Sequence, residues 1–113
     1  MIKYKDKSYV CLLDFAMDLV RGKWKALILC HLYNEPIRFL ELQRKVKGVS
    51  QKVLNEKLKE LENDELISKV IYPEIPPKVV YNLTTKGIAL TKILKQMEDW
   101  SLEYYTELKG IHN

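Results

Sequence analysis

Two short helical segments joined by a tight turn occupy residues 38–61, and this feature limits the possible fold most strongly. We expect Lys47-Gly48 to end the first helix and Ser50 to cap the second. At about 100° per residue, the second helix has a largely apolar inner side and a polar outer side. A helix that presents amide and ammonium groups outward after such a turn fits the major groove of DNA. The inner side consists of Leu54, Lys57, Leu58 and Leu61, and the outer side of Lys52, Asn55, Glu56, Lys59 and Asn63.

Two further helices are predicted before this unit. We expect Ser8 to cap the first, which runs to about residue 20 and ends at Arg21-Gly22. The second covers about residues 23–33 and ends before Pro36, because proline disfavours a helical conformation in the preceding residue. Helical spacing predicts a buried side of the first helix made of Leu12, Phe15, Ala16 and Leu19.

After the two-helix unit, the pattern changes from helical to extended. Residues 66–72 and 78–83 are rich in Val, Ile and Tyr and flank a proline-containing tip, which predicts a hairpin. A short strand at residues 37–38 and a long last helix complete the chain. The order helix, helix, strand, helix, helix, hairpin, helix is that of a winged helix-turn-helix. The expected fold class is therefore mainly α with a β-hairpin (α+β).

Composition and charge agree with a globular DNA-binding domain. The chain has 113 residues, and its longest apolar run, residues 26–30, is far too short to cross a membrane. The N-terminus shows no signal-peptide pattern, so we expect a cytoplasmic protein without membrane contacts. Residues 1–60 carry 13 Lys and Arg against 7 Asp and Glu, whereas residues 61–113 carry 6 against 8. The basic half contains the two-helix unit, as expected for contact with phosphate.

The sequence predicts no metal site, no cofactor and no catalytic centre. His31 lies in phase with Trp24 and Ile28, which favours a core histidine, and His112 lies in the C-terminal tail. Neither histidine has a cysteine or carboxylate partner at metal-ligand spacing. The sequence contains no Gly-rich phosphate loop and no recognisable pairing of nucleophile and base. We therefore expect that the protein is not an enzyme.

The candidate DNA-binding residues lie in the two-helix unit and in the hairpin. Gln51 and Asn55 can pair with adenine, and Lys52 and Lys59 can reach guanine or a phosphate. The free N–H groups of the helix that follows Ser50 suit a phosphate. The alternative for each residue is an ordinary polar surface side chain. Candidate contacts to the DNA backbone are Arg38, Arg44 and, near the tip of the hairpin, Lys78.

Five motifs occur together along the chain. They are G-K-W, R-F-x-E-L, S-Q-K-x-L, L-x-E-L-E and P-P-x-V-x-Y-x-L-T, followed by a late Trp100. With these motifs the chain resembles the HxlR family of bacterial winged helix-turn-helix regulators over about residues 11–100. The resemblance implies a homodimer that binds operator DNA as a repressor or an activator. The chain departs from the family pattern at Glu35 and Glu65, where turn glycines are usual, and at Val80, where Glu is usual.

The predicted last helix has a longer apolar stripe than the core of one small domain needs. One alternative is a helix that packs entirely on its own domain. The resemblance favours a two-fold dimer, whose interface is formed by the N- and C-terminal helices. We expect one domain over residues 1–113, with the helix-turn-helix at about 38–64, the wing at about 66–83 and a dimerisation helix at about 85–109. The stripe consists of Leu90, Ile93, Leu94, Met97, Trp100, Tyr104, Tyr105 and Leu108.

Cys11 allows two interpretations. With Ser8 as the cap, Cys11 lies in the first helical turn, where free N–H groups stabilise a thiolate. Asp14 would oppose the thiolate, and nearby lysines would favour it. Several HxlR-type proteins sense quinones, aldehydes or oxidants through a cysteine eleven residues before the G of G-K-W, and Cys11 stands at that spacing from Gly22. Cys11 is therefore a candidate redox sensor, and the alternative is an inert surface thiol. Cys30 is predicted to be buried.

The function expected from these features is sequence-specific transcriptional regulation by a homodimer that binds double-stranded DNA. Cys11 is the candidate sensor of oxidants or electrophiles, and a small-molecule effector is unknown. The alternative is a winged-helix module that binds another protein without specific DNA binding, because the fold alone does not imply DNA binding. Such a module would tend to expose apolar groups on the outer side of the recognition helix, whereas this chain exposes Lys, Asn and Gln.

Overall fold

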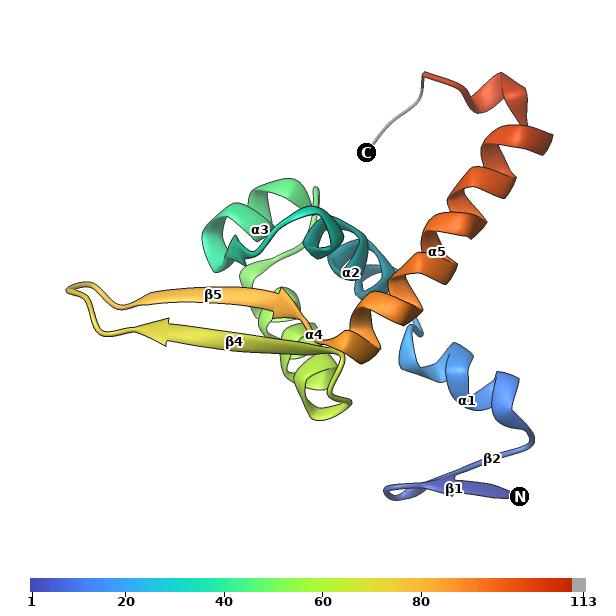
Figure 1. Ribbon diagram of the computed structural model, residues 1–113, viewed down its shortest axis with the longest axis horizontal. Helices are drawn as coiled ribbons and strands as arrows, with labels where there is room; N and C mark the ends of the chain where they lie inside the picture. Colours follow the sequence, from blue (N-terminus) through green and yellow to red (C-terminus); the bar gives the residue numbers. More distant parts are fainter. Residues whose placement is uncertain (111–113) are drawn as a thin grey trace.

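Helices surround a small antiparallel sheet, from which a long hairpin protrudes (Figure 1). The computed structural model describes residues 1–110, so His112 lies outside the described residues. Within these residues no helix has the length and apolar character needed to span a membrane. The elements are β1 (Ile2–Tyr4), β2 (Lys7–Tyr9), α1 (Leu12–Leu19), α2 (Trp24–Asn34), β3 (Ile37–Arg38), α3 (Phe39–Lys45), α4 (Gln51–Asn63), β4 (Ile67–Tyr72), β5 (Lys78–Leu83), α5 (Thr85–Tyr104) and the 3₁₀ turn η1 (Thr106–Leu108).

The predicted wing is confirmed as the β4–β5 hairpin. Strand β5 lies between β3 and β4, and all pairs are antiparallel. Ile37 pairs with Tyr81 at the base of the sheet, and Tyr72 pairs with Lys78 at the outer end of the hairpin. The sequence prediction of a mainly α fold with a β-hairpin and a winged helix-turn-helix order is therefore correct.

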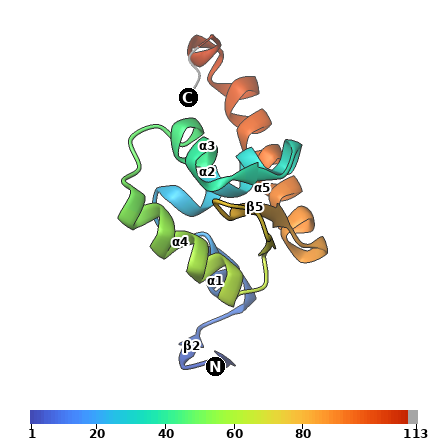
Figure 2. The ribbon, with the colours of Figure 1, turned by 90° about the vertical axis from the view of Figure 1, so that its left-hand side faces the viewer.

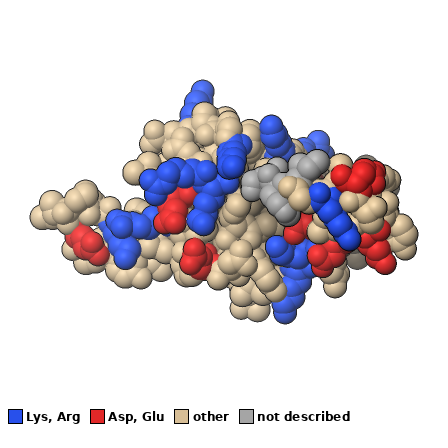
Figure 3. All heavy atoms as spheres, turned by 90° about the horizontal axis from the view of Figure 1, so that it is seen from above, with Lys and Arg blue, Asp and Glu red and all other residues tan. Residues whose placement is uncertain are grey.

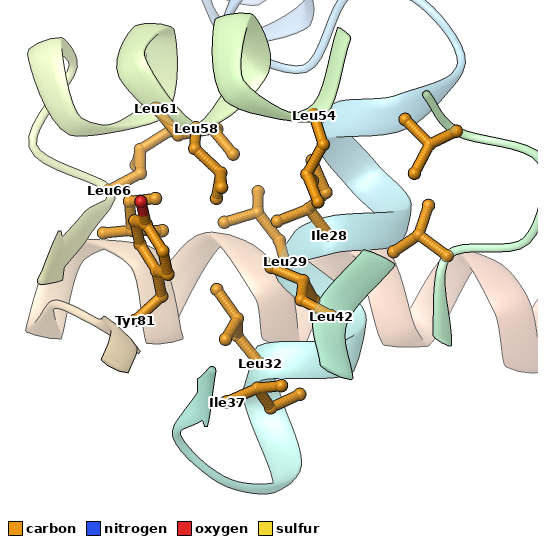
Figure 4. Packing of buried hydrophobic residues seen from close by; sticks show 13 residues of the cluster. Ile28, Leu29, Leu32, Ile37, Leu42, Leu54, Leu58, Leu61, Leu66 and Tyr81 are labelled. Carbon is orange, nitrogen blue, oxygen red and sulfur yellow. The ribbon is translucent and has the colours of Figure 1, made fainter. Parts of the chain in front are cut away.

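The core forms where α4 packs against α2 (Figure 4). Leu54, Leu58 and Leu61 project from the inner side of α4 toward Ile28 and Leu29 of α2, and all five side chains are buried. The remaining buried members of this cluster come from α2, β3, α3, the turn before α4, the start of β4 and β5. They are Leu32, Ile37, Leu42, Val46, Val49, Leu66, Ile67 and Tyr81. Burial of one side of α4 fixes its orientation, so its other side must face outward.

The junction between the wing and α5 is closely packed. Thr84 caps α5, because its hydroxyl accepts a hydrogen bond from the Gly87 N–H at 3.0 Å. A Cβ atom on Gly87 would lie 1.9 Å from the Leu66 carbonyl oxygen, so only glycine allows this approach. The junction therefore holds the base of the wing directly against the start of α5.

The N-terminal prediction was wrong. Residues 2–9 form an antiparallel β-hairpin, and Ser8 lies in β2 rather than at a helix cap. Cys11 is the N-cap residue of α1, although its side chain accepts no capping hydrogen bond. Instead, the Asp14 carboxylate accepts a hydrogen bond from the Val10 N–H at 2.9 Å. The first helix consequently begins after Cys11.

The predicted buried side of α1 was also wrong, because no residue of α1 is fully buried. Leu12 remains 71% exposed, whereas Phe15, Ala16 and Leu19 are half-buried. The ring of Phe15 packs edge-on against the N-terminal hairpin, with centroids 5.0 Å from Tyr4 and 5.4 Å from Tyr9. Helix α1 is thus covered by the hairpin on one side and open on the other.

Two further details differ from the expectations. Helix α5 ends at Tyr104 rather than near residue 109, so Tyr105 is its C-cap and Leu108 lies in the 3₁₀ turn. Of the two turn positions where family members usually carry glycine, Glu65 adopts φ +59° and Glu35 is extended at φ −167°. The left-handed geometry is therefore required only after α4, where the Glu65 side chain pairs with Lys86.

Candidate nucleic-acid interface

The turn before α4 is fixed by both backbone and side-chain contacts. Gly48 adopts φ +92°, a conformation that residues with a Cβ atom rarely adopt. Val46 and Val49 on either side of it are buried. The Ser50 hydroxyl accepts a hydrogen bond from the Val53 N–H at 3.1 Å, which confirms Ser50 as the N-cap. These contacts set the direction in which α4 leaves the turn.

The outer side of α4 lies beside the wing and is uncovered (Figure 2). The predicted base-reading residues Gln51, Lys52, Asn55 and Lys59 are all exposed. Arg38 and Arg44 are exposed at the start and in the last turn of α3. The structure therefore places every predicted residue of the two-helix unit on an accessible surface.

Lys78 is held at the outer end of the wing by an aromatic partner. Its ammonium lies 4.9 Å from the centroid of the Tyr72 ring, on the paired strand. This cation–π contact leaves the ammonium at the edge of the hairpin while orienting its stem. Sequence reasoning missed Tyr72, although its position opposite Lys78 follows from the length of the proline-containing tip.

Basic side chains on this part of the molecule are interspersed with acidic ones. Seen from above, Lys and Arg side chains occur on the wing and beside it, with Asp and Glu among them (Figure 3). On α4 itself, the exposed Glu56 lies one turn from both Lys52 and Lys59. The outer side of α4 is thus polar with mixed charge rather than uniformly basic.

Helices α1 and α5 lie on the side of the molecule away from the wing (Figure 1), and both expose large apolar side chains. On α5, Leu90 and Leu94 pack against the core, so this part of the predicted stripe belongs to the domain itself. The rest of the stripe is open, and Trp100 remains 54% exposed while contacting Tyr104 and Tyr105. We define the α1/α5 apolar surface as the exposed residues Leu12, Leu13, Met17, Ile93, Met97, Trp100, Tyr104 and Tyr105.

The two cysteines differ in their environment. Cys11 is exposed at the start of α1, whereas Cys30 is half-buried in α2. Burial raises the pKa of the Cys30 thiol. His31 is half-buried, and burial together with the charges of Lys45 and Lys95 lowers its pKa. Among residues 1–110, the His, Cys, Asp and Glu side chains form no cluster that could hold a metal ion.

A recognition helix with a polar outer side, presented by a rigid turn beside a β-hairpin, defines a winged helix-turn-helix DNA-binding protein. The family model of HxlR-like helix-turn-helix proteins matches residues 19–109. The chain therefore belongs to the HxlR-like helix-turn-helix family.

Related proteins support the same class. MalR of Fusobacterium mortiferum is 43% identical over 100 residues, which cover 88% of this chain and 94% of MalR. The transcriptional regulator YodB of Bacillus subtilis is 38% identical over 92 residues, covering 81% and 82% of the two chains. The reduced structure of YodB matches with a TM-score of 0.73, 36% identity and coverage of 86% and 95%.

The structure of the redox regulator HypR in its reduced form matches this chain with a TM-score of 0.81 and 33% identity. The match covers 88% of this chain and 98% of HypR. The oxidised form of HypR matches with a TM-score of 0.77 and 35% identity, covering 82% and 96%. Its family and these relatives show that the protein is a transcriptional regulator of the helix-turn-helix type and not an enzyme.

Proposed function

We propose that the protein binds specific operator DNA as a homodimer, with α4 as the recognition helix and the β4–β5 hairpin as the wing. The observation that carries this proposal is the uncovered polar outer side of α4 beside the wing. A surface evolved to bind another protein is enriched at its centre in apolar and aromatic side chains, and this side of α4 has none exposed. The polar surface therefore favours DNA over a protein partner.

The proposed roles follow from the chemistry of each side chain. Gln51 and Asn55 carry amides that can pair with an adenine edge, and Lys52 and Lys59 can reach guanine or a phosphate. The N-terminus of α4, which begins next to the exposed Ser50, suits a phosphate. The remaining contacts are assigned to the DNA backbone, where they set the position of the protein on the duplex. They are made by Arg38, Arg44 and Lys78.

Dimerisation is proposed to occur through the α1/α5 apolar surface. Large apolar side chains are exposed on α1 and along the C-terminal half of α5, and such concentrations mark interaction surfaces. A second copy of the chain offers the same surface and can cover it in a two-fold arrangement. The two α4 helices would then read half-sites about one turn of DNA apart.

Substitutions on α4 test the recognition helix. Asn55→Ala is expected to weaken operator binding by about 1–3 kcal/mol with little effect on random DNA, because it removes a base contact. Lys52→Ala and Lys59→Ala are expected to weaken binding to both DNAs if they contact phosphate. Gel-shift titrations at one salt concentration measure these effects. Lys92→Ala, an exposed substitution on α5, is the control. Unchanged affinity in all three α4 variants would remove α4 from the interface.

A response to oxidants through Cys11 is proposed from its exposure and from the related redox regulators. Cys11 is the N-cap residue of α1, which contributes to the α1/α5 apolar surface, so a modification there could change how two protomers pack. The relatives include HypR, described as a redox regulator in oxidised and reduced forms, and YodB, whose structure is also known after diamide treatment. Cys30 is the weaker candidate, because burial raises its pKa and reduces the thiolate fraction.

Diamide treatment of the wild-type protein is expected to change its affinity for operator DNA, whereas Cys11→Ser should be unaffected. Cys30→Ser, the control, should respond like the wild type. A thiol probe should label Cys11 faster than Cys30, because Cys11 is exposed. Fluorescence anisotropy before and after treatment measures the affinity. If Cys11→Ser responds to diamide as the wild type does, Cys11 is an inert surface thiol.

A further inference from the structure

A cavity of about 520 Å³ lies between the N-terminal hairpin, the end of α1, the start of α2 and the last turns of α4. Its volume falls within the range of small-molecule sites, which is about 300–1,000 Å³. Tyr4, Tyr9 and Leu19 provide apolar wall, while Lys25, Lys57 and Glu60 provide charge. The cavity thus combines a small apolar wall with a mainly charged lining, since nine of its fourteen lining residues are charged.

Lys25 is the unusual residue of this cavity. Its side chain is only 8% exposed, and its ammonium lies 3.5 Å from Glu60 Oε1. Glu60 also pairs with Lys57, at 3.2 Å from its other oxygen, so two ammonium groups share one carboxylate. An ammonium has three N–H donors, and burying it is costly unless these donors and its charge are satisfied. The Lys25 side chain therefore has capacity for a further anionic partner.

Partial burial acts to raise the pKa of Glu60, but the hydrogen bonds and charges of Lys57 and Lys25 outweigh it and lower the pKa. Glu60 thus remains ionised at neutral pH and neutralises one of the two lysines. The pair of lysines keeps an excess of one positive charge at this wall of the cavity.

Of the other carboxylates that line the cavity, Asp6 is exposed, and the half-buried Asp18 and Asp64 already have partners. Asp18 accepts hydrogen bonds from Tyr9 at 2.7 Å, Arg21 at 2.7 Å and Lys7 at 3.3 Å. The hydrogen bond from Tyr9, together with the charges of Lys7 and Arg21, lowers the pKa of Asp18 to about 2. Asp64 accepts a hydrogen bond from Tyr4 and pairs with Lys5. These groups are therefore not available to Lys25 and Lys57.

We propose that this cavity binds a small organic carboxylate, whose charged group pairs with Lys25 and Lys57 and whose apolar part lies against Tyr4, Tyr9 and Leu19. A carboxylate carries one negative charge, which matches the single excess positive charge of the two lysines. Phosphate carries more charge and lacks the apolar part, so it fits this lining less well. Gly22, which precedes α2, also lines the cavity, and the positive end of the α2 dipole favours an anion there.

The site would couple the N-terminal hairpin and α1 to the recognition helix α4. This consequence rests on the proposed DNA-binding function. The Tyr4 hydroxyl donates to Asp64 just after α4, and the Lys5 ammonium donates to the Asn63 carbonyl. A ligand in the cavity would therefore contact the hairpin that covers α1 as well as the last turns of α4. Occupancy would change how firmly the recognition helix is held relative to α1.

Calorimetric titration of the full chain without DNA tests the site. The probes are benzoate and phenylacetate, with benzamide, phenylacetamide and inorganic phosphate as controls at constant ionic strength. We expect saturable binding of at least one carboxylate, at least about tenfold tighter than its amide or phosphate. Lys25→Met should weaken this binding at least about tenfold, since it removes the central charge. Lys47→Met removes an exposed lysine outside the cavity and should leave the binding unchanged.

Glu60→Gln gives an effect of opposite sign. This substitution removes the Glu60 carboxylate, which competes with the ligand for Lys25 and Lys57. The ligand should therefore bind more tightly, and adding it should raise the melting temperature more than it does for the wild type. Any of three results would overturn the proposal. The first is that the wild type shows no saturable binding, the second is that Lys25→Met binds the carboxylate as tightly as the wild type, and the third is that Glu60→Gln binds it more weakly than the wild type. Because this titration contains no DNA, its failure is distinct from failure of operator binding. Gel shifts with and without the bound carboxylate then test the coupling.

Discussion

Trp100→Glu is expected to convert the protein into a monomer and to lower its operator affinity by about 100-fold or more. Trp100 remains 54% exposed within the α1/α5 apolar surface, where a large aromatic side chain is the kind of residue that dominates an interface. In the proposed dimer, a glutamate at this position would place an unpaired charge in the interface. The monomer would bind only one half-site and would lose the affinity that a dimer gains by binding two half-sites at once.

Sedimentation velocity at micromolar concentration measures the oligomeric state, and gel shifts measure the affinity. Leu40→Glu changes an exposed apolar residue on α3, outside the α1/α5 apolar surface, and should remain dimeric. Circular dichroism should show native helix content in both variants. A wild-type protein that sediments as a folded monomer would contradict the proposed dimer.

Leu58→Ala is expected to reduce the free energy of unfolding by about 2–5 kcal/mol. Leu58 is 1% exposed and packs between α4 and α2, so its truncation leaves a cavity in the centre of the core. Small domains are stable by only about 5–15 kcal/mol, so this is a large fraction of the total. Operator affinity should fall with it, because the same contact holds α4 in place.

Leu40→Ala makes the matched control for this substitution. It removes the same atoms from a side chain that is 64% exposed, and we expect a change within about 0.5 kcal/mol. Urea unfolding followed by circular dichroism gives both values. Equal destabilisation by the two substitutions would show that Leu58, at the α4–α2 contact, contributes no more to the free energy of unfolding than the exposed Leu40 does.

The helix-turn-helix and the wing were predictable because their signals are local. The side-chain period of α4 repeats over its whole length, and Ser50 provides its cap within the same segment. In the wing, two β-rich runs flank a tip with three prolines, so pairing needs no information from elsewhere in the chain. For such elements, the side chains that decide the structure lie within a few residues of one another.

The N-terminal hairpin was not predictable in the same way, since distant contacts stabilise it. Tyr4 and Tyr9 pack against Phe15, and Tyr4 reaches Asp64 at the other end of the helix-turn-helix. Helical periodicity alone also could not separate the core-facing Leu90 and Leu94 from the exposed part of α5. The cavity beside Lys25 was missed for the same reason, because its walls come from four separate segments.

On the proposed DNA-binding side of α4, Glu56 is expected to affect how the protein searches a chromosome. Its carboxylate lies on the outer side of α4, between two lysines that attract any DNA. Opposite a cytosine amino group it can accept a hydrogen bond, but opposite a phosphate or another acceptor it repels. A genome offers about 10⁶–10⁹ competing sites, so weaker attachment to the wrong sequences matters as much as tight attachment to the right one. We expect this carboxylate to shorten the time spent on incorrect sites and so to raise the fraction of molecules at the operator.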